Sequence, residues 1–345
     1  MEALSGFTCL PMVEEVTVVR VEEAVEVGRA RRAVSSLAER LGFPATRVAE
    51  IGLAVTEIGT NLHKHARGGL VFVRSVRGTD QAAVEVVAVD GGPGIADLAR
   101  ALEDGSSTAG TLGIGLGAVA RLADSSAITS RPGRGTALVA RFHPQHRPQE
   151  EIPEDVAAGI SRPIGSEEVC GDAYAVRRAP GRLSLMMCDG SGHGPLAASA
   201  SRAAVRAFCE LRPGPPEETV ARLHEVLRGT RGGALAVAEL DLTARTVRFA
   251  GLGNIAAAIL GGGQKRGMIS VPGVAGHNAR TIRAFDHELP EDAVVVLHSD
   301  GLTERWTIDR GDDLLHGPPV LIAATLLRDA GVRRDDACVL VGKPW

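Results

Sequence analysis

The chain has 345 residues, of which 44% are hydrophobic and 23% charged, so its composition is that of a globular protein and not of a disordered one. Two domains are expected at this length, because single domains usually have about 100 to 200 residues. The 38 basic and 42 acidic residues give a net charge of −4, and only 3% of residues are aromatic. These values exclude a nucleic-acid-binding protein that neutralises phosphates or stacks bases.

The five cysteines, at positions 9, 170, 188, 209 and 338, share no C-x-x-C spacing and are odd in number. Neither a disulfide framework nor a zinc ribbon is therefore expected. The first residues lack a basic stretch followed by an apolar one, and no window of about 18 residues is apolar and uncharged, so neither a secretory signal nor a membrane span is expected. Together these features predict a reduced, cytoplasmic setting.

In the first part of the chain, the apolar periodicity predicts an α/β domain, with one sheet and helices on a face of it. The predicted elements are a strand over 16–21, helices over 23–41 and 46–66, strands over 70–77 and 83–90, a short helix over 114–123, and strands over 126–131 and 135–142. A Gly-rich segment precedes the short helix.

The segment HPQHRPQEEIPED, from His143 to Asp155, has one isoleucine as its only aliphatic side chain besides the prolines. It cannot bury itself and predicts a linker over 143–154. The pattern then changes to strand-rich segments, ALAVAELDL, TVRFAGLG, IAAAILGG and AVVVLHSDG, with helices over 195–211 and 217–227. The sequence thus predicts a first domain over 1–142 and a second, of different architecture, over 155–345.

Three motifs of the first domain are candidates for a nucleotide site. Glu57 and Asn61 lie one turn apart on a helix, a spacing that is also common on solvated helix faces. The sequence DGGPGI over 90–95 follows an apolar strand directly, where a simple tight turn is the alternative. GTLGIGLG over 110–117 opens a helix, whose free N–H groups attract phosphate, although a flexible hinge would serve equally well.

In this order and spacing, E-x-x-x-N, D-G-G-P-G-I and G-x-G-L-G followed by RPGRGTALVARF resemble the ATP-binding domain of the GHKL superfamily. Over about residues 15–142 the match is closest to the anti-sigma-factor and RsbT-type serine/threonine switch kinases. The resemblance implies a GHKL (Bergerat) α/β sandwich that binds ATP and Mg²⁺. It also implies that Asn61 holds Mg²⁺, that Glu57 is the catalytic residue that orients or deprotonates the attacking hydroxyl, and that Asp90 accepts from the adenine amino group. Five glycines are assigned to the backbone around the triphosphate: Gly92, Gly94, Gly113, Gly115 and Gly117.

In the second part, aspartates stand at strand ends beside small residues in four segments: CGDAY over 170–174, DGSGHG over 189–194, SDGL over 299–302 and DDA over 335–337. A sheet fold can bring strand ends to one point, and hard carboxylate oxygens suit Mg²⁺ or Mn²⁺. We therefore expect a metal site, with four unrelated turn aspartates as the alternative.

These four segments resemble the PP2C-type serine/threonine phosphatases of the bacterial SpoIIE and RsbX branch, over about residues 155–343, and D-G-x-G-H-G is the most specific piece. The resemblance implies an α+β fold, a β-sandwich flanked by helices, with two Mg²⁺ or Mn²⁺ ions. By the family pattern Asp172 and Asp189 bridge the metals and the carbonyl of Gly190 is an extra ligand. Asp300 and Asp335 complete the set, and Asp336 is the alternative to Asp335.

One position departs from the family pattern, because Cys170 stands where many relatives have glycine. A thiol beside metal could be oxidisable, and a small buried residue is the other reading. His193, which follows in the DGSGHG segment, is read either as a contact to the phosphate or as a structural residue of the turn.

Together the two resemblances predict a bifunctional enzyme that phosphorylates and dephosphorylates serine or threonine of a partner protein. They imply partner-switching control of a sigma factor, with a STAS-domain anti-sigma antagonist or a stressosome scaffold as the partner. A sigma factor or a downstream phosphatase is a further candidate. As alternatives, the N-terminal domain is a nucleotide-dependent anti-sigma binding module or an ATP sensor without kinase turnover. A homodimer is left open, and neither nucleic acid nor membrane is expected as a partner.

Overall fold

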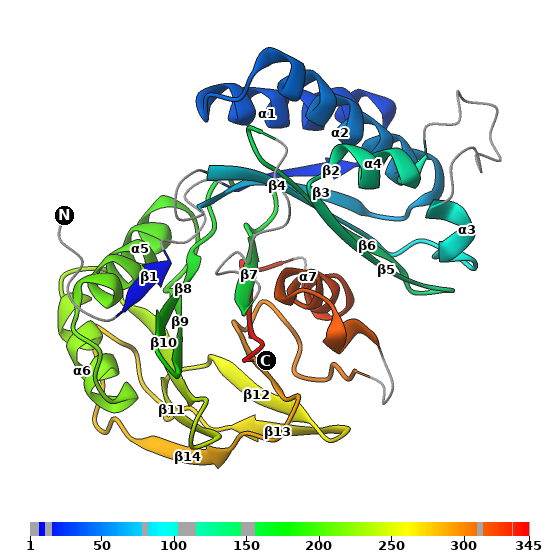
Figure 1. Cartoon of the computed structure of the whole chain (residues 1–345). Coiled ribbons are helices and arrows are strands. Elements are labelled where there is room, and N and C mark those ends of the chain that lie inside the picture. Colours follow the sequence, from blue (N-terminus) through cyan, green and yellow to red (C-terminus); the bar gives the residue numbers. More distant parts are fainter. Residues whose placement is uncertain are drawn as a thin grey trace. The chain divides into compact units, whose positions relative to one another are not determined.

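The computed structural model describes residues 7–10, 16–77, 82–102, 115–145, 156–308, 313–332 and 334–344 (Figure 1). The chain divides into two compact units, Val13–Ile152 on the one hand and Met1–Met12 with Pro153–Trp345 on the other. The predicted combination of an α/β first part and a sheet-rich second part with helices is confirmed.

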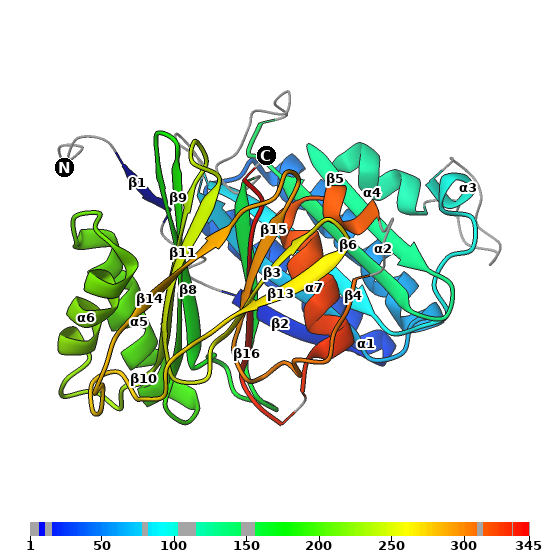
Figure 2. The ribbon, with the colours of Figure 1, turned by 90° about the horizontal axis from the view of Figure 1, so that it is seen from below.

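The N-terminal unit is an antiparallel sheet with helices on one face, and its strand order is β2-β3-β4-β6-β5 (Figure 2). The strands are β2 (Val16–Val21), β3 (Gly69–Arg77), β4 (Ala82–Asp90), β5 (Ser125–Arg131) and β6 (Gly135–Phe142). The helices are α1 (Ala24–Arg40), α2 (Ala45–His65), α3 (Leu98–Leu102) and α4 (Leu116–Leu122).

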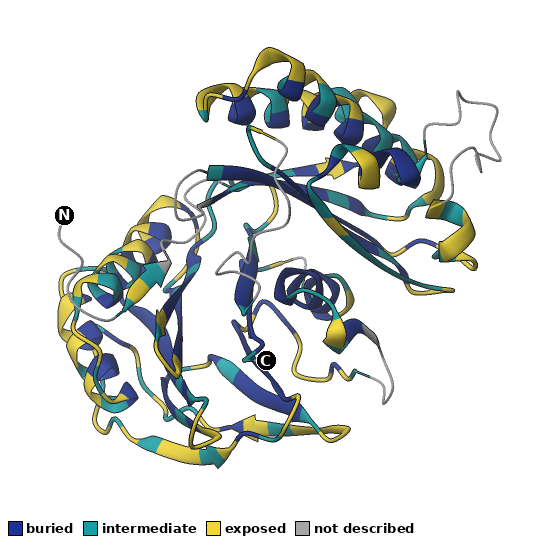
Figure 3. Cartoon of the chain, in the orientation of Figure 1, coloured by how far each residue is buried: buried dark blue, intermediate teal, exposed yellow. Residues whose placement is uncertain are grey.

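Apolar side chains at helical spacing hold α1 and α2 on the sheet. Ala30, Val34 and Leu37 of α1 are buried, as are Ile51 and Val55 of α2. They form one core with alternate residues of the strands, among them Val71, Val73, Val84, Val86, Leu138 and Ala140. Figure 3 shows that the buried parts of both helices face the sheet. Because each apolar Å² removed from water contributes about 25 cal/mol, this layer is the main stabilising term of the unit.

A buried charge triad crosses the middle of this sheet. Glu85 on β4 lies directly opposite Arg74 on β3 and Arg141 on β6. Its two carboxylate oxygens are 2.6 Å from Arg74 Nη2 and 2.8 Å from Arg141 Nη2, and all three side chains are buried. A buried charge is costly in the low dielectric of the interior unless it is paired, and here the carboxylate is paired with two guanidinium groups.

The C-terminal unit is a β-sandwich of two antiparallel sheets. The first has the order β1-β8-β9-β10-β11-β14 and the second β13-β12-β15-β16-β7. The strands of the first are β1 (Thr8–Leu10), β8 (Asp172–Ala179), β9 (Arg182–Gly190), β10 (Gly233–Asp241), β11 (Thr246–Leu252) and β14 (Ala284–Glu288). Those of the second are β7 (Ala157–Arg162), β12 (Ala256–Gly261), β13 (Gln264–Met268), β15 (Val294–His298) and β16 (Ala337–Gly342).

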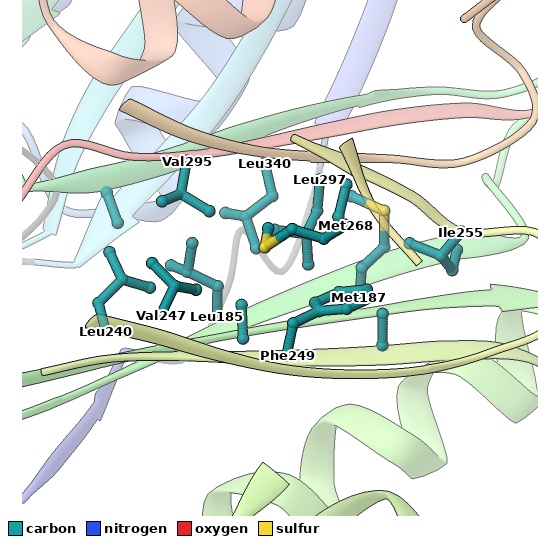
Figure 4. Close-up of a cluster of buried hydrophobic side chains, with 14 of the residues drawn as sticks. Leu185, Met187, Leu240, Val247, Phe249, Ile255, Met268, Val295, Leu297 and Leu340 are labelled. Carbon is teal, nitrogen blue, oxygen red and sulfur yellow. The ribbon is translucent and has the colours of Figure 1, made fainter. Parts of the chain in front are cut away.

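The sandwich core lies between the two sheets (Figure 4). Leu185, Met187 and Phe249 of the first sheet pack there with Val295 and Leu340 of the second. A second cluster joins the outer face of the first sheet to α5 (Gly194–Glu210) and α6 (Pro216–Val226). The second sheet carries α7 (Pro319–Ala330) beside β7 and β16, preceded by a 3-10 turn, η2 (Asp313–His316).

The beginning of the chain belongs to the C-terminal unit, although the sequence prediction counts residues 8–10 within 1–142. Strand β1 pairs with β8, and Cys9 forms a disulfide with Cys209 of α5. The expectation that the cysteines do not pair is therefore wrong for these two. The bond joins residues 200 positions apart, and no local spacing reveals such a pairing.

The helix α7 is absent from the sequence prediction. Its segment PVLIAATLLRDA is apolar on all sides and almost entirely buried, so it lacks the polar face that marks a surface helix. Within the described parts of the chain, no helix has both the length and the apolar character needed to cross a bilayer.

Candidate nucleotide-binding and metal sites

The first candidate site begins on the last turns of α2. Glu57 and Asn61 follow one another at i and i+4, and both are partly buried. Burial raises the pKa of Glu57, and the charge of Lys64 counteracts this in part. A carboxylate with a raised pKa, one turn from an amide oxygen, fits the predicted pair of a proton acceptor and a magnesium ligand.

The end of β4 lies against the end of α2. Asp90 is buried, and its Oδ1 accepts a 2.6 Å hydrogen bond from Gly92 N, while Gly91 N donates to Arg67 O. A Cβ on Gly92 would stand 2.7 Å from Asp90 Oδ1 and 2.8 Å from His65 O, so no larger residue fits there. The structure therefore brings Asp90 and the helix that carries Glu57 and Asn61 together.

The rest of the D-G-G-P-G-I turn is fixed on the β5–β6 hairpin. Gly94 has a φ of 72°, and a Cβ on it would lie 2.1 Å from Arg131 O. Ile95 N donates to Ser130 Oγ over 2.8 Å, and Gly133 N donates to Pro93 O. Glycine at 94 thus serves both a left-handed backbone and a close approach.

Of the remaining predicted glycines, Gly115 is the N-cap residue of α4 and Gly117 is buried in its first turn. Helix α4 packs on α2, where Arg47 donates to Leu122 O at the end of α4. Gly113 lies outside the described residues, so its predicted contact with the triphosphate stays a prediction.

The second candidate site lies at strand ends of the sandwich. Asp172, the first residue of β8, is directly opposite Asp189 near the end of β9. Asp300 follows β15, and Asp335 precedes β16. Ser299 and Cys338 exchange hydrogen bonds, Ser299 N to Cys338 O and Cys338 N to Ser299 Oγ, which holds these two strand ends side by side.

The electrostatics show that the four predicted carboxylates converge. Burial raises the pKa of Asp189 to about 9, and the charges of Asp172, Asp300 and Asp335 add to this. Burial likewise raises the pKa of Asp172 to about 7. Partial burial and the charge of Asp335 raise the pKa of Asp300. The 2.7 Å hydrogen bond that Asn254 Nδ2 donates to Asp300 Oδ2 lowers it in part.

Such a cluster fits divalent cations. Four acidic side chains from two sheets face one another, and the buried Oδ2 of Asp172 has no hydrogen-bond partner among the described residues. Buried carboxylates without partners are costly unless cations compensate them. Their hard oxygens, together with the carbonyl of Gly190 at the end of β9, are the donors that Mg²⁺ and Mn²⁺ prefer.

The two neighbouring aspartates have different surroundings. Asp336 is buried and accepts hydrogen bonds from Ile164 N at 2.7 Å and Gly171 N at 2.8 Å, so it holds the loop before Asp172 in place. The charge of Asp335 instead acts on Asp189 and Asp300. The ligand atoms of Asp336 also lie within 4.8 Å of those of Asp172 and Cys170, so the choice of Asp335 over Asp336 stays a prediction. The hydrogen bonds give Asp336 a further role in holding the loop, which the sequence did not indicate.

The side chains next to the cluster refine two further expectations. Burial and the charges of Asp172 and Asp336 raise the pKa of Cys170 well above its ordinary value, and its Sγ donates to Arg162 O over 3.5 Å. His193 is the exposed N-cap residue of α5, and its Nδ1 lies 3.2 Å from Glu167 Oε1. Glu167 and Asn254 were not singled out from sequence, because an isolated polar residue in a loop carries no pattern.

Comparisons with known proteins agree with this division of the chain. The family model described as a histidine kinase-like ATPase domain matches residues 21–142, and that described as stage II sporulation protein E (SpoIIE) matches residues 179–343. The serine/threonine-protein kinase RsbT of Bacillus subtilis (strain 168) is 34% identical over 122 residues, which are 35% of this chain and 92% of RsbT.

Solved structures with similar folds include one described as "The bacterial stressosome: a modular system that has been adapted to control secondary messenger signaling". It has 28% identity and a TM-score of 0.50, and the match covers 54% of this chain and 98% of that one. RsbX in complex with magnesium has 16% identity and a TM-score of 0.47, with 54% and 94% covered. The PP2C phosphatase domain of SpoIIE from Bacillus subtilis, with a fragment of its regulatory domain, has 14% identity and a TM-score of 0.43, with 92% and 95% covered.

Proposed function

Since the chain belongs, through its N-terminal part, to the RsbT family of serine/threonine-protein kinases and carries a SpoIIE-type PP2C phosphatase domain in its C-terminal part, we propose that it both phosphorylates and dephosphorylates a partner protein. The domains are assigned to residues 1–142 and 155–345, with β1 contributed to the second. The observation that carries the phosphatase assignment is the convergence of four aspartates from two sheets. The kinase assignment rests on the arrangement of Glu57, Asn61 and Asp90 and on the RsbT relationship.

In the kinase reaction Asn61 would hold Mg²⁺, and Asp90 would accept a hydrogen bond from the adenine amino group. The turn after β4 and the start of α4 supply backbone N–H groups to the phosphates, through Gly92, Gly94, Gly113, Gly115 and Gly117. Glu57 orients the serine or threonine hydroxyl of the partner and accepts its proton. Its raised pKa makes it a better proton acceptor than an exposed glutamate.

In the phosphatase reaction two Mg²⁺ or Mn²⁺ ions would be held by the carboxylates of Asp172, Asp189, Asp300 and Asp335 and by the carbonyl of Gly190. Bound ions would activate the attacking water and neutralise charge on the transferring phosphoryl group. The chain itself fixes the ligands, because Asp172 and Asp189 are paired across β8 and β9 and Asp336 clamps the loop that precedes Asp172. Asn254 orients the Asp300 carboxylate.

The RsbT relationship and the stressosome-derived structure favour a STAS-domain protein as the partner, either an anti-sigma antagonist or a stressosome scaffold. Opposed activities on one chain would set the phosphorylation level of that partner and, through partner switching, the activity of a sigma factor. We place the protein in the cytoplasm, where such partners and ATP are found.

The test follows phosphorylation of a purified STAS-domain partner by mass spectrometry. Mg²⁺ and ATP should add phosphate to one serine or threonine, and Mn²⁺ without ATP should remove it. Glu57→Gln should lose only the first activity and Asp189→Asn only the second. Glu39→Gln on the exposed side of α1 and Asp286→Asn on the edge strand β14 are controls that should change neither.

The same experiment separates the alternatives for the N-terminal unit. A binding module or ATP sensor would bind ATP and retain the partner, or alter the dephosphorylation rate, without adding phosphate. A wild-type protein that leaves phosphoserine untouched with either metal would refute the phosphatase assignment.

A further inference from the structure

We propose that Arg231 binds the phosphoryl group of the phosphoprotein substrate at the metal centre, an inference that rests on the phosphatase function proposed above. The comparisons and the motifs assign no role to this residue. It follows from where the chain places one guanidinium group beside the carboxylate cluster.

The position of Arg231 is set by the pairing of β9 with β10. Asp189 and Gly190 lie opposite Ala234 and Gly233, so the residues before Gly233 continue alongside the turn that follows Asp189. Ser191 N in that turn donates to Gly232 O over 2.9 Å. A Cβ built on Gly192 would lie 3.2 Å from Arg231 Nη1, which places the guanidinium over the turn that joins Asp189 to α5.

The backbone around Arg231 is held on both sides. Gly232 N donates to Thr230 Oγ1 over 2.9 Å, and Gly233 N donates to Ala275 O over 3.1 Å. The Nε2 atom of His277 lies 3.1 Å from Arg231 O and donates to it when that nitrogen carries the proton. Loop 273–278 thereby fixes the Cα of Arg231 and hence the region that its side chain can reach.

The side chain of Arg231 is available to bind a ligand. It is exposed, and among the described residues it forms neither a hydrogen bond nor an ion pair. Two arginines on strands of the adjoining sheet differ, because Arg182 pairs with Glu239 and Arg248 with Glu217. The backbone of Arg231 is therefore fixed, and its unpaired guanidinium group lies beside the turn that carries Asp189. This arrangement is expected of a group that binds an anionic ligand.

The chemistry of the site calls for such a group. Two divalent ions would balance the four carboxylates, which leaves the two negative charges of the phosphate ester without a compensating group. A guanidinium presents a planar fork that matches two phosphate oxygens, which a lysine ammonium cannot reproduce. Glycine at 192, with a φ of 87°, leaves the space beside the guanidinium free of a side chain.

The test uses the full chain and two readouts. Inorganic phosphate is titrated calorimetrically into the Mg²⁺-loaded protein, and KM and kcat are measured on a phosphoserine peptide. In Arg231→Ala, the Kd for phosphate and the KM should each rise about 10- to 100-fold, as expected for the loss of a charged hydrogen bond. The affinity for Mg²⁺ should stay that of the wild type, and Arg231→Lys should recover part of the loss.

Arg212→Ala is the matched control. It removes an exposed arginine just beyond the other end of α5, about 25 Å from the turn at Gly192 by the rise of a 17-residue helix, and should change neither constant. Wild-type Kd and KM in Arg231→Ala would overturn the proposal, as would a loss of Mg²⁺ affinity that accounts for the loss of phosphate binding. Failure of the phosphatase function itself looks different, because the wild type would then not cleave the peptide, or Asp189→Asn would cleave it equally well.

Discussion

Replacing Glu85 with glutamine should destabilise the N-terminal unit strongly, because two buried guanidinium groups lose their shared carboxylate. The side chains of Glu85, Arg74 and Arg141 are 0%, 1% and 7% exposed, and the closest contacts are 2.6 and 2.8 Å. Removing one partner of a buried ion pair costs about 3–5 kcal/mol. That is a large part of the 5–15 kcal/mol by which domains are usually stable, so the unit should become marginal at 25 °C.

The chain offers a clean assay for this loss. Both tryptophans and the single tyrosine, at positions 306, 345 and 174, lie in the C-terminal unit, whereas far-UV circular dichroism reports on both units. In urea, Glu85→Gln should shift part of the dichroism transition to lower concentration and leave the tryptophan transition in place. The shifted part should also be the one that an ATP analogue stabilises. Glu39→Gln, an exposed change on α1, should shift neither.

The pH dependence gives a second check with a definite sign. Burial by itself would raise the pKa of Glu85, but the charges of Arg74 and Arg141 and their hydrogen bonds lower it below its ordinary value. The stabilisation is therefore fully present above the unfolded pKa, near 4.3, and is lost as the pH falls through the folded pKa. The stability difference between wild type and Glu85→Gln should be constant from pH 8 to about pH 5 and should shrink below that.

A triple replacement separates the cost of a broken pair from the value of the triad. With Met, Leu and Met at positions 74, 85 and 141, no buried charge is left, and stability should return to within about 1–2 kcal/mol of the wild type or exceed it. The reasoning is refuted if Glu85→Gln alone unfolds at the wild-type urea concentration.

Three further changes test other parts of the structure. Glu57→Gln should lower the kinase rate about 100- to 10,000-fold. Because burial raises the pKa of Glu57, the wild-type kcat/KM should begin to fall with decreasing pH at a pH above the range in which an exposed glutamate titrates. Gly135→Ala would put a Cβ 1.9 Å from Asp90 O and should cost stability and affinity for an ATP analogue, measured by titration, whereas Gly133→Ala, with a similar φ and no atom within 4 Å, should show only the smaller backbone strain. Cys209→Ser should remove the covalent link between β1 and α5 without loss of phosphatase activity, and non-reducing peptide mapping of the wild type should show the disulfide that this variant lacks.

The long helices of the N-terminal unit were predictable because each buries one apolar stripe, and its central strands because they are short apolar runs between turns. Helix α2 was expected over 46–66 and is found over Ala45–His65, and β6 has the predicted bounds. Helix α7 was missed because a helix that is apolar all round has no periodicity to detect. The three-residue β1 is too short for any pattern, and only its pairing with β8 makes it a strand.

The candidate sites show the same limit at the level of single residues. Glycine-rich turns and strand-end aspartates indicated the right regions, because both sites use backbone and carboxylates at the ends of strands. Sequence could not separate Asp335 from Asp336, since only the fold shows that Asp336 accepts hydrogen bonds from Ile164 N and Gly171 N. Arg231 gave no sequence signal, because only the fold brings its guanidinium next to Gly192, which is 39 positions away in the chain.

During synthesis, β1 leaves the ribosome long before the strand and the cysteine with which it pairs. Cys9 emerges 200 residues before Cys209, which at about 5–20 residues per second is about 10 to 40 seconds. During that time the whole ATP-binding unit is made, while β1 has no sheet to join. A chain that is shortened to its phosphatase part would lack this strand and leave the edge of β8 open to strands of other molecules. Strand β1 thus covers the edge of a sheet whose other strands are synthesised only after the whole ATP-binding unit.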